Sequence, residues 1–230
     1  MTTDLPQILM ALITGIVSGL VLSMPVGPVN LTILNESTRR GFFAGMLVGL
    51  GASSMELIYC AIAFTGFTQF FEVRMIKTSM EVFSFVFFLF LGMKFLRAQN
   101  LQAPTEFGKA AQRFTARVDE KFQPESAFMM GFARVMGNFG VLFFWIVLAA
   151  NFLSRDWVAD TLAAKAACIA GVAAGTNTWF CGLSFAASRG HGRLSEPALL
   201  RMERFSGLCL LGLGVIEGIH IGWQLANHKI

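Results

Sequence analysis

Residues 24–30, Met-Pro-Val-Gly-Pro-Val-Asn, lie inside an apolar block that is long enough to cross a lipid bilayer. Pro25 and Pro28 remove two backbone N–H donors and clash with preceding carbonyl groups, and Gly27 adds backbone freedom between them. An α-helix cannot run smoothly through this stretch. Backbone groups freed at membrane depth are tolerated only against protein or a water-filled cavity. The stretch therefore predicts a broken membrane helix, with either a packed kink or a solute site at the break.

A helix that restarts near Pro28 directs unpaired N–H groups and the positive end of its dipole at the break. Such helix ends bind anionic groups, including the carboxylates of transported solutes. We therefore expect a solute carboxylate at this break, with a lining formed by Pro25, Gly27, Pro28 and Asn30.

The composition of the whole chain agrees with a lipid environment. Only 14% of the 230 residues are charged and 55% are hydrophobic, whereas soluble domains carry about a quarter charged residues. The mean hydropathy is +0.62. The net charge of +4 is small and its basic residues lie between apolar blocks, which argues against a nucleic-acid partner. The N-terminus has no basic region before the first apolar block, so we expect a retained span rather than a signal peptide.

Six apolar blocks reach the roughly 20 residues that a transmembrane helix needs. The sequence therefore predicts an all-α membrane protein with six transmembrane helices. A polar stretch over residues 98–126 divides it into a first three-helix repeat, 1–97, and a second, 127–230, and is itself expected to form a cytoplasmic amphipathic loop. The six blocks lie near 8–34, 42–66, 79–97, 127–153, 161–187 and 204–226.

The distribution of Lys and Arg predicts the orientation, because cytoplasmic loops are enriched in both. The loops after the first, third and fifth spans carry twelve such residues and the opposite side carries five. We expect the twelve on the cytoplasmic side of a bacterial inner membrane, with both termini outside. The twelve are Arg39, Arg40, Lys94, Arg97, Lys109, Arg113, Arg117, Lys121, Arg189, Arg193, Arg201 and Arg204, and the five are Arg74, Lys77, Arg155, Lys165 and Lys229.

An internal repeat relates the third span to the sixth. Residues 80–92, MEVFSFVFFLFLG, match residues 202–214, MERFSGLCLLGLG, at seven of thirteen positions with an offset of 122. Two copies of three helices must enter the membrane in opposite orientations. Inverted repeats of this kind are common in secondary transporters, whose solute site lies near mid-membrane at the repeat interface.

The fourth span has its own irregular stretch, where Gly137 and Asn138 follow Arg134. As the counterpart of the first break, it predicts that the fourth helix is broken too. Charged side chains inside spans cost roughly 2.5 kcal/mol or more and usually mark function. Three such residues, Glu56, Arg134 and Glu217, are therefore candidate transport residues, as are the polar Thr176 and Asn177 of the fifth span.

Simpler roles remain open for several of these residues. Arg134 could extend to the membrane interface, and Glu217 could pair with His220 one turn later. Thr176 and Asn177 could make hydrogen bonds between helices. Glycines at four-residue spacing, such as Gly41, Gly45 and Gly49, permit close helix packing, and one such face is a candidate contact in a homodimer.

With these residues in view, the chain resembles the L-lysine exporter (LysE/RhtB) family of amino-acid translocators over nearly its whole length. The resemblance rests on Pro25-Val-Gly27-Pro28, on the glycine run that leads to Glu56, and on residues 88–97, 175–180 and 205–214. It implies export of amino acids or close derivatives, with proton exchange, across a bacterial inner membrane and with no cofactor. One departure is that Asn138 is followed by Phe139-Gly140, where the family commonly has Pro-Lys, so no role of that pair can be transferred.

Two other functional classes have weaker support in the sequence. A divalent metal-cation transporter needs clustered carboxylates or His and Cys ligands at membrane depth, and Glu56 and Glu217 are only two. An intramembrane thiol oxidoreductase with inverted repeats needs cysteines in the first and fourth helices, which have none. The chain also lacks an HExxH or a GxSxG motif, so we do not expect an enzyme. Its cysteines, at 60, 168, 181 and 209, lie in apolar blocks as packing residues do.

Overall fold

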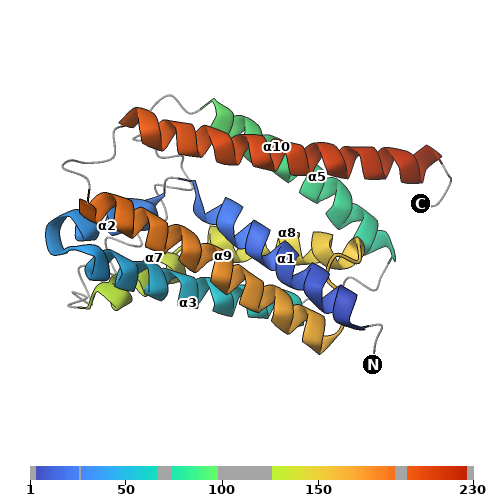
Figure 1. The fold of residues 1–230 in the computed structure, drawn as a ribbon. Helices are drawn as coiled ribbons and strands as arrows, with labels where there is room; N and C mark the ends of the chain where they lie inside the picture. Colours follow the sequence, from blue (N-terminus) through green and yellow to red (C-terminus); the bar gives the residue numbers. More distant parts are fainter. Residues whose placement is uncertain (1–3, 26, 67–73, 98–125, 190–195, 227–230) are drawn as a thin grey trace.

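A computed structural model describes residues 4–25, 27–66, 74–97, 126–189 and 196–226, and these residues form a bundle of α-helices (Figure 1). The expected loop 98–126 lies outside the described residues except for Ser126. The helices are α1 (Asp4–Ser23), α2 (Pro28–Arg40), α3 (Phe42–Gly66), α5 (Arg74–Leu96), α7 (Ala127–Met136), α8 (Phe139–Ser154), α9 (Leu162–Arg189) and α10 (Glu196–Ala226).

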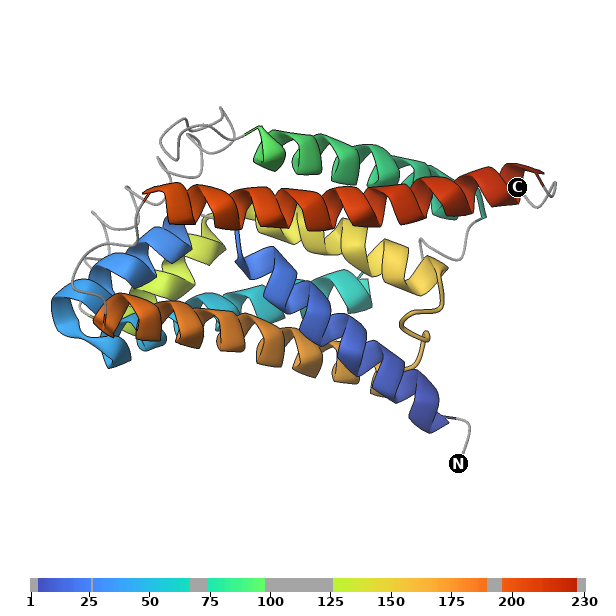
Figure 2. The same ribbon diagram turned by 45° about the horizontal axis from the view of Figure 1, so that its top comes forward.

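The helices form two groups (Figures 1 and 2). α5 and α10 lie side by side on one face of the molecule, and α5 also contacts α8. In the other group, α1 packs along α9, while α3 contacts α2, α7, α8 and α9. α3 is therefore the helix around which both irregular segments are arranged.

The described residues contain four helices that are long and apolar enough to cross a membrane, or five if α7 and α8 together count as one bent span. These helices lie within Leu5–Ser23, Phe42–Gly66, Leu162–Arg189 and Leu200–Trp223. α5, which occupies the expected third span, has 23 residues and is not among the four. All six expected spans are helical over most of their length, but six membrane crossings remain a prediction.

The first expected span, 8–34, differs from the structure. α1 starts earlier, at Asp4, and ends at Ser23, and a separate helix α2 continues to Arg40. The apolar span ends with α1 at Ser23, and the 13-residue α2, which has two arginines in its last turn, is not part of it. The fourth expected span, 127–153, is divided into α7 and α8.

Glycines bring the helices into close contact. A Cβ atom on Gly15 would overlap the carbonyl of Cys168 in α9, and one on Gly171 would overlap the carbonyl of Leu12 in α1. Close backbone approach of this kind is typical of helices packed in lipid. There the hydrophobic effect does not drive helices together, and small residues permit the close van der Waals packing that does.

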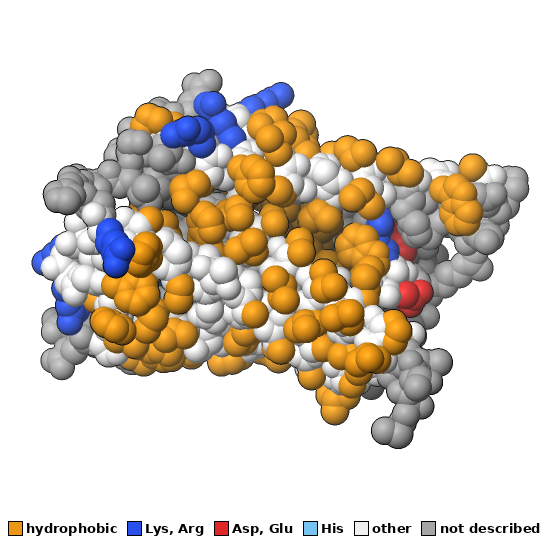
Figure 3. All heavy atoms as spheres, in the orientation of Figure 1, with side chains coloured by type: hydrophobic (Ala, Val, Ile, Leu, Met, Phe, Trp, Pro, Cys, Tyr) orange, Lys and Arg blue, Asp and Glu red, His pale blue; other side chains and the backbone are white. Residues whose placement is uncertain are grey.

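On the face drawn in Figure 3, hydrophobic side chains cover the middle of the bundle and charged side chains lie toward its ends. On α1, Leu9, Ile13 and Val17 repeat every fourth residue and are each at least 50% exposed. Exposed apolar stripes of this extent are matched by lipid rather than by water. Basic side chains gather at the end where α2 and α9 finish (Figure 3, left).

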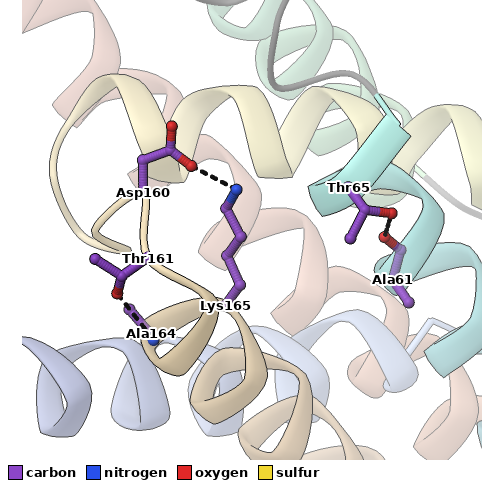
Figure 4. A network of polar contacts seen from close by, with 6 residues as sticks. All are labelled: Ala61, Thr65, Asp160, Thr161, Ala164 and Lys165. Atoms are coloured by element: carbon purple, nitrogen blue, oxygen red, sulfur yellow. Dashed lines mark hydrogen bonds and ion pairs between the residues drawn. The ribbon is translucent and has the colours of Figure 1, made fainter.

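Two basic residues at the opposite end, Lys165 and Arg155, have partners in the loop between α8 and α9 (Lys165 in Figure 4). Lys165, near the start of α9, forms an ion pair with Asp160 in the preceding loop. The guanidinium of Arg155 lies 5.4 Å from the ring centre of Trp157 in the same loop. This difference between the two ends agrees with the charge asymmetry of the loops, while the assignment of the basic end to the cytoplasm remains a prediction.

Candidate functional site at two helix breaks

The first break separates α1 from α2 and is held by a single side chain. α1 ends at Ser23 and α2 begins at Pro28, as the two prolines predicted. The amide nitrogen of Asn30 donates to the carbonyl oxygens of Ser23, at 2.8 Å, and of Pro25, at 2.7 Å. Asn30 is buried, and its side-chain oxygen Oδ1 has no hydrogen-bond partner among the residues that the structure describes. The side chain thus satisfies two carbonyls that the break exposes, and it leaves one buried acceptor unused.

Gly27, at the N-cap of α2, does not use the conformational freedom expected of it. Its φ of −111° and ψ of −175° are extended values that any residue adopts. A Cβ atom built on Gly27 would meet nothing within 4 Å. The dihedrals therefore do not require glycine at this position, and the space beside it is open. Pro28 occupies the first position of α2, where its missing N–H costs no helical hydrogen bond.

The second break separates α7 from α8, which meet at an angle of 68°. α7 ends at Met136, and the cap Gly137 has ordinary right-handed helical dihedrals of −75° and −7°. Asn138 then takes φ −106° and ψ 78° at the N-cap of α8, without a side-chain capping bond. The chain therefore turns at Asn138, and no proline is involved.

Tyr59 of α3 contacts the second break. Its hydroxyl donates to the carbonyl oxygen of Met136, the last residue of α7, at 2.8 Å. Tyr59 is only 4% exposed. The hydroxyl therefore satisfies, from a different helix, a carbonyl at the end of α7 that a helix end leaves without an intrahelical partner.

A chain of polar contacts leads from the first break to Glu56 of α3. The hydroxyl of Ser23 donates to the carbonyl of Gly19 and lies 3.2 Å from the Thr176 hydroxyl of α9. Thr176 Oγ1 lies 3.3 Å from the Gly19 carbonyl and 3.4 Å from Glu56 Oε2. One threonine proton thus has two acceptors, one on α1 and one on α3.

Both breaks lie beside the middle of long helices. Thr176, which contacts the end of α1, stands at the centre of α9 (Leu162–Arg189), and Glu56 lies near the centre of α3 (Phe42–Gly66). Tyr59 follows Glu56 by three residues, so the two side chains share one face of α3. One short segment of α3 therefore contacts the polar network of the first break through Glu56 and the second break through Tyr59.

A comparison with protein families decides the classification. The LysE type translocator model matches residues 20–217, most of the chain, including both breaks and all of α3. The chain belongs to the LysE type translocator family. It is a multi-pass membrane protein. One relative of this translocator is the "Putative amino acid efflux protein YcgF" of Bacillus subtilis (strain 168), which is 27% identical over 214 residues, covering 91% of this chain and 93% of the relative. No solved structure matches the chain.

The structure of this LysE-type translocator brings together most of the residues that the sequence indicated. Asn30 and Pro25 meet at the first break, and Thr176 lies beside Glu56. Asn177 belongs to a neighbouring contact, in which its amide donates to the Ser53 hydroxyl of α3 at 2.9 Å. Thr176 and Asn177 therefore make the interhelical hydrogen bonds that were weighed as their simpler role, and Thr176 does so next to Glu56.

Two expected residues have no described place in this network. Arg134 is half-buried in the last turn of α7, one residue before Val135 and two before the break. The backbone of Glu217 belongs to α10, which packs mainly on α5, while its side chain and that of His220 lie outside the described residues. The transport roles expected of Arg134 and Glu217 stay predictions.

Sequence reasoning missed three members of the site: Ser23, Ser53 and Tyr59. Their partners are 153, 124 and 77 residues away in the chain. Serine and tyrosine inside an apolar run are compatible with simple packing, so only the single tyrosine of this chain, placed one turn after Glu56, offered a signal. Two buried carboxylates elsewhere, Glu36 and Glu81, were also not singled out.

Candidate metal ligands do not gather in the part of the chain that the structure describes, where no group of three His, Cys, Asp or Glu side chains could hold an ion. Cys60 of α3 and Cys168 of α9 are fully buried free thiols, and Cys181 and Cys209 are partly exposed.

Proposed function

We propose that this protein is a secondary transporter of the bacterial inner membrane that exports amino acids or close derivatives in exchange for protons. Six transmembrane helices arranged as two inverted repeats alternate access to a site between the two breaks. Membership of the LysE type translocator family supports transport of a solute, and the name of the Bacillus subtilis relative supports efflux of amino acids.

The observation that carries the proposal is the meeting of both breaks on one segment of α3. The start of α2 offers N–H groups and the positive end of a helix dipole, which suit a carboxylate. Glu56, half-buried, and the unused oxygen of Asn30 are acceptors that suit an ammonium group. A donor end and acceptor side chains joined by one polar network fit a zwitterion, and the open space beside Gly27 supports a solute there.

The position of Thr176 supports coupling to protons. When Glu56 is ionised, the threonine hydroxyl can donate to its carboxylate; when Glu56 is protonated, the hydroxyl can turn to the carbonyl of Gly19 instead. Gly19 lies in the last turn and a half of α1, one turn before Ser23. Protonation of Glu56 would in this way change a hydrogen bond to the helix that ends at the first break.

The packing of α5 against α10 supports the inverted repeat. Gly92 faces Leu211, and Gly214 faces Leu89. Adding 122 to the α5 member of each pair gives the α10 member of the other pair, since Gly92 corresponds to Gly214 and Leu89 to Leu211. Ser84 and Ser206, which are related by the same offset, are both fully buried. These reciprocal contacts are the ones expected if a local two-fold axis relates α5 to α10, and they support the proposed inverted repeat.

Counterflow of labelled amino acids into proteoliposomes tests the proposal. Proteoliposomes that contain the purified protein are loaded with an unlabelled neutral, basic or acidic amino acid. They should accumulate the same amino acid in labelled form from outside, and an imposed proton gradient should drive net transport. Glu56→Gln should remove the response to the gradient, while Ser54→Ala, which removes an exposed hydroxyl bonded within α3, should not. Transport of divalent metal ions without any amino acid would favour the metal-cation alternative, and loss of transport on replacing all four cysteines by serine would favour the thiol alternative.

A further inference from the structure

Tyr59 stands at a point where the second break has two alternative hydrogen-bonding patterns. In a continuous α-helix, the N–H of Gly140 would donate to the carbonyl of Met136, four residues earlier. In the structure the Tyr59 hydroxyl donates to that carbonyl, and α7 and α8 are bent by 68°. Nothing in the local sequence forbids the continuous form, since residues 137–140 contain no proline and Gly137 already has helical dihedrals.

We propose that Tyr59 is the positioning residue that holds the fourth helix bent, and that its hydroxyl and the N–H of Gly140 exchange at the Met136 carbonyl during transport. The part of this inference that concerns transport rests on the proposed function. The bent state needs the hydroxyl from α3, whereas the straight state needs only the helix itself. Because Tyr59 lies one turn from Glu56, a change at the solute site moves the donor of this bond with it.

The first break has no such alternative. Pro28 has no N–H to give to the carbonyl of Met24, so α1 and α2 cannot join in a regular helix. The two breaks therefore have different roles. The first keeps a permanent helix end at the site, and the second changes between bent and straight.

A distance measurement on the whole protein in lipid nanodiscs tests the proposal without needing transport. Spin labels are attached at Ser126→Cys, before α7, and at Ser154→Cys, the last residue of α8, with the partly exposed Cys181 and Cys209 replaced by alanine. When helices of 10 and 16 residues are bent by 68° away from a straight line, their two outer ends lie about 6 Å closer together than in a straight helix. Tyr59→Phe removes only the hydroxyl, and we expect the ratio of long to short distances to rise about 3- to 10-fold, the effect of one buried hydrogen bond.

Two further variants distinguish positioning from general loss of structure. Ser54→Ala removes a hydroxyl from the same helix that donates to the Leu50 carbonyl one turn earlier, and should leave the distances unchanged. Phe139→Pro places proline at the first position of α8, where it favours a helix start and cannot join the helices. Combined with Tyr59→Phe it should restore the short distance but not transport, because transport needs the straight state as well, whereas Phe139→Ala should not restore the short distance.

An unchanged distance distribution in Tyr59→Phe would overturn the proposal, as would equal restoration by Phe139→Ala. If wild-type protein transported no amino acid, the proposed function would fail, yet the distance shift in Tyr59→Phe would still decide whether this tyrosine controls the bend.

Discussion

Both breaks are linked to one short segment of α3, through Glu56 and Tyr59, but they have different physical origins. The first is built into the covalent chain, because Pro25 and Pro28 remove backbone donors and Asn30 then satisfies the carbonyls that are left. The second has no proline, and its freed carbonyl is satisfied from outside by Tyr59. A break made by proline is permanent, whereas a break made by a tertiary hydrogen bond exists only while the neighbouring helix supplies the donor.

Replacement of Asn30 by alanine should have the largest effect. It leaves two buried carbonyls of the first break without donors, each at a cost of about 1–3 kcal/mol. We expect the free energy of unfolding to fall by roughly 2–4 kcal/mol, measured by denaturant unfolding in detergent micelles. Asn35→Ala, at an exposed position of the same helix, is the matched control and should change it little. Equal stability of the two variants would mean that the first break does not depend on Asn30.

Replacement of Thr176 by valine should come next, and should act only on the first break. The side chain keeps its shape but loses the hydroxyl that joins Gly19 and Glu56. We expect proton-driven export in proteoliposomes to fall about tenfold, the effect of roughly 1.4 kcal/mol, while Thr176→Ser retains most of it. A valine variant with wild-type response to the proton gradient would remove Thr176 from the coupling.

Replacement of Tyr59 by phenylalanine should reduce the free energy of unfolding by only about 0.5–1.5 kcal/mol. The loss is smaller than for Asn30→Ala because the Met136 carbonyl can accept from the Gly140 N–H instead. Thermal unfolding of both variants in the same detergent measures the difference. A Tyr59→Phe variant as unstable as Asn30→Ala would show that both breaks are rigid.

Replacement of Gly27 by alanine should have the smallest effect on stability. Its dihedrals suit any residue and the new methyl group would meet nothing within 4 Å. We expect the free energy of unfolding to change by less than about 0.5 kcal/mol, or to rise slightly because alanine restricts the unfolded chain. If the free energy of unfolding fell by more than about 2 kcal/mol in the same assay, the space beside Gly27 would be filled by protein atoms rather than open.

The contrast between the breaks also explains what the sequence could predict. The first break follows from proline geometry, which is local, and it appears where residues 24–28 placed it. The second was expected at Gly137 and Asn138 only through the repeat, and its position was correct. Gly27 lies at the break as expected, but its extended dihedrals are open to any residue and do not require glycine.

The partners that complete the site could not be predicted because they join distant segments. Tyr59 has no local feature that identifies Met136 as its acceptor, and Ser23 contacts Thr176 only because glycines allow α1 to pack closely on α9. The first span was expected to continue to residue 34, because an apolar block is defined by composition, whereas the helix ends where its hydrogen bonds end.

The central claim, that the open space beside Gly27 belongs to the solute site, is tested most directly by labelling a cysteine there. A Gly27→Cys variant in membrane vesicles would be treated with a water-soluble maleimide, with and without a panel of amino acids. We expect the thiol to react, and the amino acid that shows counterflow to slow its reaction in proportion to its binding. A thiol that reacts at the same rate with every amino acid present, or that only lipid-soluble reagents reach, would contradict a solute site at the first break.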